Sequence, residues 1–258
     1  MSYLEELFGI AGRTAVLTGA GGHLCGEMAR NYARAGCNVV VTDLRAEKAE
    51  AVAAEITQAG GQAIGLALDA TSKDGFEQVV AKAAETYGPV SIAVNGAGIN
   101  ASTPFLDIAL EDWQAVMDSQ ITSTFLGCQV FGAHMLDHGY GSIINVSSAS
   151  AGPPLSKAYA YSVAKAGILN LTQNLGREWG TTGVRVNAIR PGFFPTDWNR
   201  KNFITPEREA AILGHTPMNR YGAPSELNGA MIWLASDASG FVTGAEIEVD
   251  GGYSAMTI

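Results

Sequence analysis

Short apolar runs rich in β-branched residues alternate along this chain with longer amphipathic segments, and this alternation constrains the fold more than any other feature. The runs are almost continuously apolar, as is typical of strands buried on both faces. Alternating strands and helices form a parallel sheet that right-handed crossovers cover on both sides, so we expect one doubly wound α/β domain over residues 1–258. The expected strands are 14–18, 38–42, 63–68, 90–95, 141–147, 184–189 and 245–250. The expected helices are 24–35, 45–59, 72–87, 111–138, 158–180 and 224–236.

Composition supports one folded domain and argues against several kinds of partner. Hydrophobic residues make up 47% of the 258 residues and charged residues 16%, which is enough apolar material for a packed core. The net charge of −9 disfavours nucleic acid and anionic membranes. The start shows no basic region before a long apolar run, and no stretch approaches a membrane span. Cys25, Cys37 and Cys128 match no metal pattern, so we expect no metal and a reducing, cytoplasmic location.

The stretch TGAGGHLCG (18–26) follows the first expected strand and has the properties of a phosphate-binding turn. Glycine allows a diphosphate to approach the backbone N–H groups at the start of a helix. Asp43 ends the second strand about 20 residues past the turn, where a carboxylate can accept both ribose hydroxyls of an adenosine. Capping of the next helix is an equally good interpretation of Asp43. The segment NGAG (95–98) would let backbone pass close to a cofactor, or form a simple tight turn.

The strongest group of chemical residues lies around the fifth strand and the helix after it. Ser148 follows that strand, and Tyr161 and Lys165 stand four residues apart on one helical face. The reference pKa of a tyrosine is about 10, and a neighbouring ammonium stabilises the phenolate and lowers it. Such pairs are also common on helix surfaces. The surrounding motifs favour a general acid/base here.

In this order the motifs resemble those of the short-chain dehydrogenase/reductase family over essentially the whole chain. The matching segments are Thr18 with Gly19, NGAG (95–98), Ser148, Tyr161 with Lys165, Asn187 with PGFFPT (191–196), VTG (242–244) and DGG (250–252). The resemblance implies a Rossmann-type domain whose seven-stranded parallel sheet has the order 3-2-1-4-5-6-7. It also implies an NAD(P)-dependent oxidoreductase that interconverts a secondary alcohol and a ketone.

The resemblance also implies roles for individual residues. Tyr161 would be the general acid/base, Ser148 would hold the substrate oxygen, and Lys165 would also bind the nicotinamide ribose. The implied cofactor site comprises Thr18, Gly19, Gly21, Gly22, His23, Leu24, Asp43, Asp69, Ala70, Asn95, Gly96, Ala97, Tyr161, Lys165, Pro191, Gly192, Phe193 and Thr196.

Four positions in three segments depart from the family pattern. The second and third turn glycines of the family fall on His23 and Cys25, so we expect phosphate binding with a shifted local path. A thiol in the first helical turn can have a lowered pKa, but packing is the favoured role of Cys25. Gly96 replaces an asparagine that would brace the nearby backbone, and a more flexible segment is expected. Gln120 replaces an asparagine assigned to a helix kink and a water relay to the lysine, so we treat it as a catalytic candidate.

Asp43 indicates NAD as the cofactor. A 2′-phosphate beside this carboxylate would face like-charge repulsion, and Arg45 is the one candidate for compensation near the turn.

The irregular stretch from 191 to about 217 is expected to form a substrate lid over about 192–217. Its polar, basic character favours a sugar, a polyol or a sugar acid, although the same charges also suit a solvated lid. The substrate candidates are Ser150, Phe194, Trp198, Asn199 and Arg200.

Two other functions stay open at this point. A 3-oxoacyl-carrier-protein reductase is one, although the expected helix 111–138 has no Arg or Lys to receive an acidic carrier protein. A nucleotide-binding regulator without turnover is the other, and the intact Ser148, Tyr161 and Lys165 argue against it. The apolar faces of helices 111–138 and 158–180, with the resemblance, predict a homotetramer or a homodimer.

Overall fold

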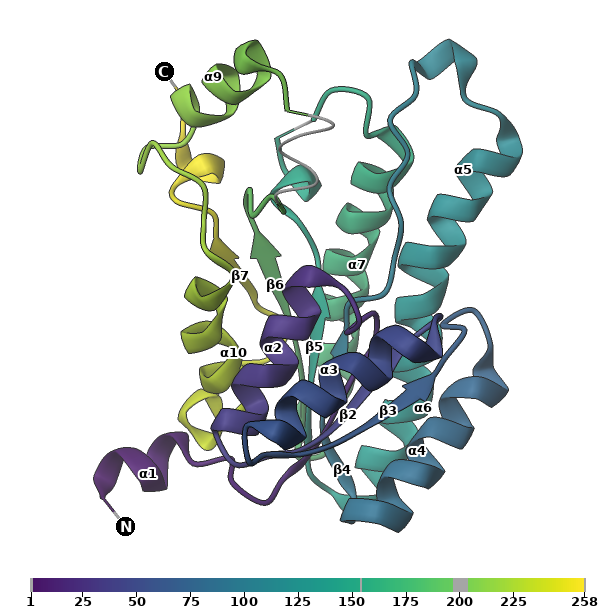
Figure 1. Cartoon of the computed structure of the whole chain (residues 1–258), viewed down its shortest axis with the longest axis vertical. Helices are drawn as coiled ribbons and strands as arrows, with labels where there is room; N and C mark the ends of the chain where they lie inside the picture. The colour runs from purple at the N-terminus through teal and green to yellow at the C-terminus, as the bar shows by residue number, and fades with distance from the viewer. Residues whose placement is uncertain (1, 154, 197–203, 258) are drawn as a thin grey trace.

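The structure is a computed structural model that describes residues 2–153, 155–196 and 204–257. Within these residues seven parallel strands form one sheet in the order β3-β2-β1-β4-β5-β6-β7, which confirms the expected topology (Figure 1). The strands are β1 (Thr14–Leu17), β2 (Asn38–Asp43), β3 (Gln62–Ala67), β4 (Val90–Asn95), β5 (Gly141–Val146), β6 (Val184–Pro191) and β7 (Glu246–Val249).

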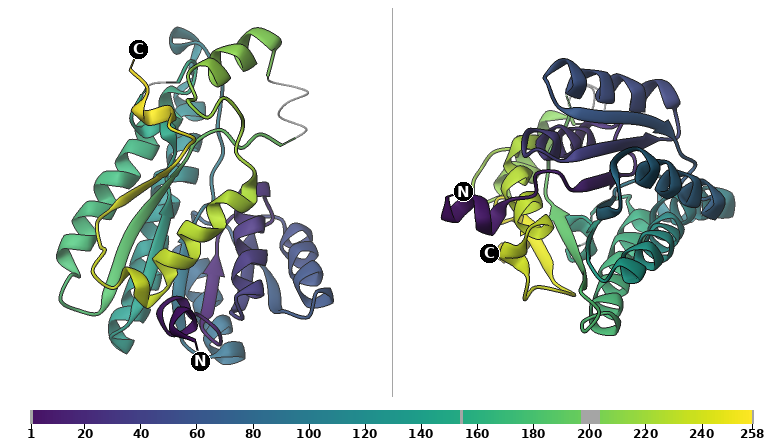
Figure 2. Two further views of the ribbon diagram at one scale, coloured as in Figure 1. Left: turned by 90° about the vertical axis from the view of Figure 1, so that its left-hand side faces the viewer. Right: turned by 90° about the horizontal axis from the view of Figure 1, so that it is seen from below.

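Helices cover both faces of this sheet, as the two further views in Figure 2 show. The helices are α1 (Tyr3–Phe8), α2 (His23–Arg34), α3 (Ala46–Gln58), α4 (Lys73–Tyr87), α5 (Leu110–Met117), α6 (Ser123–His138), α7 (Tyr159–Glu178), α9 (Pro206–Gly214) and α10 (Asn228–Ala235). The buried residues of α2, α3 and α10 form one apolar cluster with the sheet, and those of α4 and α6 form the other.

The central strand β1 contributes to both clusters because successive side chains point to opposite faces. Leu17 packs in the cluster that contains Tyr32, and Val16 packs in the cluster that contains Phe76 and Phe131. The last two rings meet edge to face with their centroids 5.5 Å apart. Burial on both faces explains why the strands are apolar throughout, and it fixes the edge at which the functional loops leave the sheet.

Buried amides tie the carboxyl ends of β4 and β5 together. Asn95 pairs with Asn145 in the strand register, and the Nδ2 of Asn95 donates to the Oδ1 of Asn145 at 2.9 Å. The Nδ2 of Asn145 in turn donates to the Oγ1 of Thr172 on α7, also at 2.9 Å. The segment after β4 and the helix that carries the candidate catalytic residues are therefore held in fixed relation.

Two expected elements differ in detail from the structure. The expected helix 111–138 is divided into α5 and α6 by a π-helical turn at Asp118–Thr122. The stretch 191–217, expected to be irregular, contains helix α9. Thr205 caps α9 by accepting a hydrogen bond from the N–H of Arg208 at 3.2 Å, and Pro206 occupies its first turn, so Thr-Pro-Glu was a start signal.

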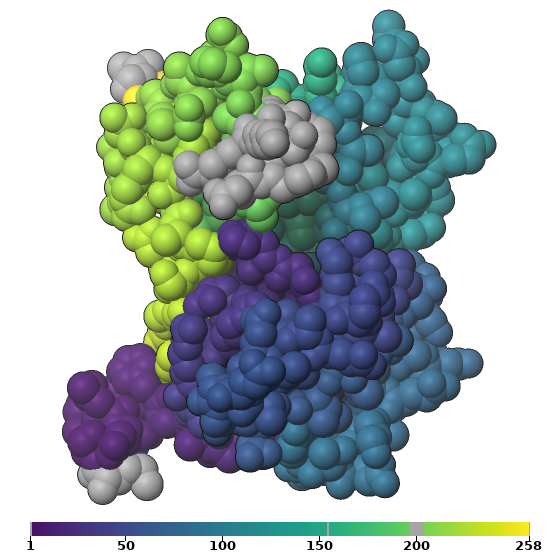
Figure 3. Space-filling model, viewed as in Figure 1, coloured from purple at the N-terminus to yellow at the C-terminus, as the bar shows by residue number. Residues whose placement is uncertain are grey.

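The short helix α1 was not expected from the sequence. Its first turn is held by a capping box, in which Ser2 and Glu5 exchange hydrogen bonds between side chain and backbone. None of its residues is buried, so no apolar periodicity marked it. Figure 3 shows α1 as a projection from the body of the molecule.

Candidate active site

A cleft of about 790 Å³ lies along the carboxyl ends of β1, β4, β5 and β6. Ligands of doubly wound folds bind at this edge of the sheet. The expected site residues that line the cleft are Gly19, Gly22, His23, Leu24, Gly96, Gln120, Ser148, Tyr161, Lys165, Pro191, Gly192, Phe193 and Phe194. The fold thus brings the glycine-rich turn and the candidate catalytic residues to one cavity.

The glycine-rich turn is fastened to the segment after β4. Gly19 has a φ of +65°, and a Cβ on it would lie 2.8 Å from the Cα of Ala97, so only glycine fits this close approach. The Oγ1 of Thr18 accepts hydrogen bonds from the N–H groups of Gly96 at 3.0 Å and Ala97 at 3.2 Å. Gly22 caps α2 without a side-chain hydrogen bond, which leaves the first N–H groups of the helix for a ligand. This end of α2 fits a diphosphate.

Two departures from the family pattern prove to be structurally coupled. The Sγ of Cys25 lies 2.3 Å from the position that a Cβ on Gly96 would take. A side chain at position 96 is therefore incompatible with the thiol, and the thiol occupies the space that the missing asparagine leaves. Burial raises the pKa of Cys25 to about 11, which makes it a packing residue with a neutral thiol.

The two oxygens of Asp43 have different surroundings. Its Oδ1 accepts a hydrogen bond from the N–H of Arg45 at 3.1 Å, at the start of α3. Its Oδ2 lies 2.8 Å from where a Cβ on Gly21 would stand, so this oxygen faces the glycine-rich turn. Lys48 lies at the same place, with its Cβ 2.6 Å from that position. The sequence analysis missed Lys48, whose position depends on how α3 packs against the turn.

Other predicted cofactor residues lie at the border of the cleft or behind it. Asp69 accepts hydrogen bonds from Thr71, which lower the pKa of its carboxyl. The N–H of Leu68 donates to the carbonyl of Asp43, which places Asp69 and Ala70 near Asp43. Asn95 is buried and its amide joins β4 to β5, so its side chain supports the sheet rather than lining the cavity.

The three candidate catalytic residues meet at the floor of the cleft. Ser148 follows β5, and Tyr161 lies in the first turn of α7 and lines the same cavity. Lys165 lies one turn further along α7, with its Nζ 5.5 Å from the centroid of the Tyr161 ring. The Nζ also donates to the carbonyl of Val146 at 2.6 Å, which fixes the side chain beneath the tyrosine.

Burial dominates the proton affinities at this floor. It raises the pKa of the Tyr161 phenol, and the hydrogen bond with Ser148 opposes this rise. Burial also lowers the pKa of Lys165 to about 8. In this geometry the burial of the phenol is the largest effect on Tyr161, and its pKa lies above the ordinary value.

Gln120 lies in the π-helical turn and lines the cleft. Its Nε2 donates to the carbonyl of Ile99 at 2.8 Å, and its amide covers Gly98, where a Cβ would lie 2.3 Å from the amide carbon. Its Oε1 is buried without a partner among the described residues. The extra methylene thus lets Gln120 brace the segment after β4, and one amide oxygen is left for a donor in the cleft.

Pro191, Gly192 and Phe193 line the cleft where β6 ends, and Thr196 lies half-buried beyond them. Arg190 directly before them is buried and was missed, although a cation within an apolar strand was a visible signal. Its guanidinium donates to the carbonyls of Ser148 and Ala149 (both 3.4 Å), to Glu248 (2.7 Å) and Glu246 (3.3 Å), and to the hydroxyl of Ser254 (3.5 Å). It therefore ties the Ser148 loop to β7.

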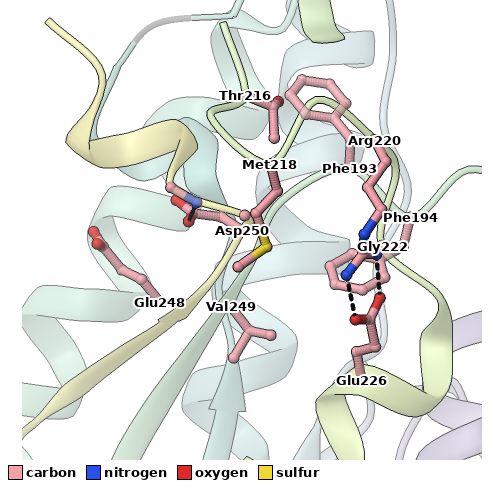
Figure 4. A pocket seen from close by; sticks show the side chains of 12 residues that line it. Phe193, Phe194, Thr216, Met218, Arg220, Gly222, Glu226, Glu248, Val249 and Asp250 are labelled. Carbon is pink, nitrogen blue, oxygen red and sulfur yellow. Dashed lines mark hydrogen bonds and ion pairs between the residues drawn. The ribbon is translucent and has the colours of Figure 1, made fainter.

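The substrate candidates have different outcomes. Phe194 lines the main cleft and also a second cavity of about 350 Å³ behind it, where Arg220 and Glu226 form an ion pair (Figure 4). Ser150 is buried and does not line the main cleft. Trp198, Asn199 and Arg200 lie outside the described residues. Two cations that the sequence analysis did not single out, Lys157 and Arg208, do line it.

No helix in the described ranges is long and apolar enough to cross a membrane. In the same part of the chain, no three His, Cys, Asp or Glu side chains gather where they could hold a metal ion.

Comparison with known proteins agrees with this geometry. The family model described as enoyl-(acyl carrier protein) reductase matches residues 22–254. An uncharacterized oxidoreductase, UxuB, of Bacillus subtilis is 40% identical, with 96% of this chain and 97% of the relative covered.

Two solved structures are similar over nearly their whole length. One is a gluconate 5-dehydrogenase of Burkholderia cenocepacia in complex with NADP and tartrate, with 30% identity, a TM-score of 0.93, and 99% of this chain and 100% of that chain covered. The other is a chain described as a D-mannonate oxidoreductase of Haemophilus influenza with bound NAD, with 34% identity, a TM-score of 0.92, and 96% and 97% covered. With these matches and the cleft described above, the chain belongs to the short-chain dehydrogenase/reductase family of oxidoreductases.

Proposed function

We propose that this protein is an NAD-dependent dehydrogenase that interconverts a secondary alcohol and a ketone, with a sugar, a polyol or a sugar acid as substrate. The observation that carries the proposal is that Ser148, Tyr161 and the buried Lys165 line one cleft together with the glycine-rich turn, with the Lys165 Nζ 5.5 Å from the centroid of the Tyr161 ring.

The residues at this floor have complementary tasks. In the direction of oxidation, the phenolate of Tyr161 takes the hydroxyl proton of the substrate, while Ser148 holds the same oxygen by a hydrogen bond. Lys165 places a positive charge beneath the ring, at 5.5 Å from its centroid, and so stabilises the phenolate. A nicotinamide bound beside Pro191 and Gly192 supplies the acceptor for the hydride.

The direction of the pKa shift gives the proposal a pH dependence. Because burial raises the pKa of Tyr161, the neutral phenol predominates near neutral pH. Ketone reduction, which needs the phenol as an acid, should be efficient there. Alcohol oxidation, which needs the phenolate, should accelerate as the pH rises.

NAD is proposed as the cofactor because of Asp43. One oxygen of this carboxylate faces the glycine-rich turn, where it can accept the ribose hydroxyls and repel a 2′-phosphate. Arg45 lies 3.8 Å from the other oxygen and Lys48 stands beside Gly21, so cations are close enough to weaken this preference.

Initial rates test the proposal directly. Absorbance of the reduced nicotinamide is followed with NAD and with NADP against a panel of alditols, sugars and aldonic acids. We expect turnover of at least one compound and a higher kcat/KM with NAD. Absence of turnover across the panel, in both directions, contradicts the dehydrogenase proposal, and equal or better turnover with NADP contradicts the cofactor assignment alone.

Assembly is proposed from apolar side chains on the outer faces of α6 and α7. Phe125, Tyr159 and Val163 are each at least 40% exposed. We expect two copies to pair along these helices, and a tetramer to have a further interface near β7. We also propose a cytoplasmic location. Light scattering at micromolar concentration that finds monomers only contradicts the pairing.

A further inference from the structure

The charges around the cleft are distributed unevenly. The chain has 25 acidic and 16 basic residues, yet no Asp or Glu is among the described residues that line the cleft. Lys157, Lys165 and Arg208 do line it. None of these three forms an ion pair within the described part of the chain, whereas most other described arginines and lysines do. A cavity with unpaired cations and no carboxylate attracts an anion.

Resting on the proposed function, we propose that Lys157 and Arg208 form the binding site for the carboxylate of the substrate, so that the enzyme selects aldonic acids over neutral polyols.

Lys157 is held at the catalytic end of the cleft. It lies four residues before Tyr161, in the segment that leads into α7, and its neighbours Ser156 and Ala158 also line the cavity. Its backbone has a φ of +58°, a left-handed conformation that is strained for a residue with a Cβ. Such conformations cluster at ligand-binding sites, where they set the direction of a side chain. Lys157 is exposed at this border of the cavity, four residues before Tyr161.

Arg208 approaches from another wall of the cavity. It lies on α9, and Ile212, one turn further along the same helix face, also lines the cleft and is 8% exposed. Ile212 is buried and Arg208, one turn before it, is exposed, so Arg208 lies at the border of the cavity. Ile204, just before the helix, lines the cavity as well.

The dinucleotide does not account for these two cations. Its diphosphate has the open N-terminus of α2, and its adenosine end has Asp43 and Lys48. Lys157 and Arg208 instead line the same cavity as Tyr161, beside which the alcohol must lie for proton transfer. A guanidinium binds both oxygens of a carboxylate through paired N–H donors, and an ammonium adds a second point charge. The geometry fits a hydroxy acid whose carboxylate is at a distance from the reacting carbon.

The test compares aldonic acids with the alditols of the same carbon skeleton. kcat/KM is measured for each pair in the wild type and in Lys157→Met, Arg208→Met and the double variant. We expect each single substitution to lower kcat/KM for the acid by at least about tenfold, the effect of losing a hydrogen bond to a charged group, and to leave the alditol within about twofold. The preference for the acid should also fall as salt is added.

Arg177→Met is the matched control, since Arg177 is an exposed, unpaired cation on α7 outside the cleft. Calorimetric titration of each protein with NADH and then with gluconate separates the causes. Unchanged affinity for NADH with weaker binding of gluconate supports the carboxylate site. Equal losses for acid and alditol, weaker binding of NADH in the variants, or a wild type that prefers alditols overturns it. A wild type that binds neither NADH nor gluconate overturns both proposals, whereas turnover of neutral polyols alone overturns only this one.

Discussion

The catalytic segment and the cofactor segment of this cleft differ in how closely they follow the family pattern. From the end of β5 into α7, Ser148, Tyr161 and Lys165 stand at the family's positions and meet in the cavity. Around the glycine-rich turn, Cys25, Gly96 and Gln120 all depart from it. Proton transfer needs particular atoms at particular places, whereas binding of a diphosphate by backbone N–H groups needs only a suitable shape.

The departures in the cofactor segment compensate for one another. The thiol of Cys25 fills the space beside Gly96, and the amide of Gln120 covers Gly98 and holds the carbonyl of Ile99. Each change alone would leave a clash or a gap. Together they give the cofactor segment a packing of its own. The comparison of this altered segment with the unaltered catalytic segment leads to five expectations.

The largest effect is expected in the catalytic segment. Tyr161→Phe removes the phenol that exchanges the proton, so kcat/KM should fall by at least about a hundredfold. The matched control is Tyr159→Phe, because Tyr159 begins the same helix and its exposed ring packs on Phe105 instead. Comparable activities of the two variants would contradict the role of Tyr161.

Arg190 should matter next, because it connects the Ser148 loop to β7. Arg190→Lys keeps the charge but loses the paired donors that hold two carbonyls and two carboxylates. We expect kcat to fall by about tenfold through displacement of Ser148, with the affinity for NADH unchanged. Arg185→Lys is the control at the other end of β6, where the guanidinium caps the carbonyls of Leu234 and Ser236. If both variants lose the same stability and neither loses kcat, Arg190 has no positioning role.

A double-mutant cycle measures the coupling in the cofactor segment. Gly96→Ala should weaken NADH binding, because the new methyl group meets the thiol of Cys25, and Cys25→Gly should restore much of the loss. We expect a coupling free energy of about 1 to 2 kcal/mol from calorimetric titrations of the four proteins. Additive effects of the two substitutions would mean that the two departures are independent.

Gln120 should tolerate change better than the catalytic residues. Gln120→Asn shortens the side chain that holds Ile99, and we expect activity to stay within about tenfold of wild type, a barrier change of at most about 1.4 kcal/mol. Gln120→Ala distinguishes bracing from a proton relay. A relay requires an altered pH–rate profile, so an unchanged profile and kcat would exclude it.

The smallest expected effect lies far from the cleft, at His134. Its Nε2 accepts a hydrogen bond from the N–H of Val90 at 3.0 Å, and burial lowers its pKa. The neutral form is thus favoured on folding. The contribution of neutral His134 to the free energy of unfolding is complete above the ordinary pKa of about 6.5. It is lost as the pH falls below that value, because the unfolded chain then binds a proton more readily than the folded one. Denaturant unfolding should show a shallower loss of stability between about pH 7 and pH 5 in His134→Gln than in the wild type. An identical pH dependence in the two proteins would contradict this.

The fold was predictable because its signals are local. Continuous burial of β1, β4 and β5 produces apolar runs, and the period of the helices appears directly in the sequence. Helix α9 was overlooked because irregular composition outweighed the start signal at Thr205 and Pro206. Helix α1 has no buried face, so it left no periodicity to detect.

The candidate site was predictable only in part. Ser148, Tyr161 and Lys165 carry a spacing that the sequence displays. The coupling of Cys25 to Gly96 joins residues 71 positions apart, and the closeness of Lys48 to Gly21 depends on the packing of α3. Lys157 and Arg208 line one cavity although they belong to distant segments of the chain. Contacts between distant segments have no local pattern from which to infer them.

Direct binding of the cofactor tests most sharply whether the repacked segment still works beside an intact catalytic segment. NADH is titrated calorimetrically into the wild type and into Tyr161→Phe, and the turnover of both proteins is measured under the same conditions. We expect similar affinities for NADH in the two proteins and turnover in the wild type alone. A wild type that does not bind NADH would contradict the claim that the altered segment still binds the cofactor. A Tyr161→Phe variant that keeps its turnover would contradict the claim that the catalytic segment transfers the proton.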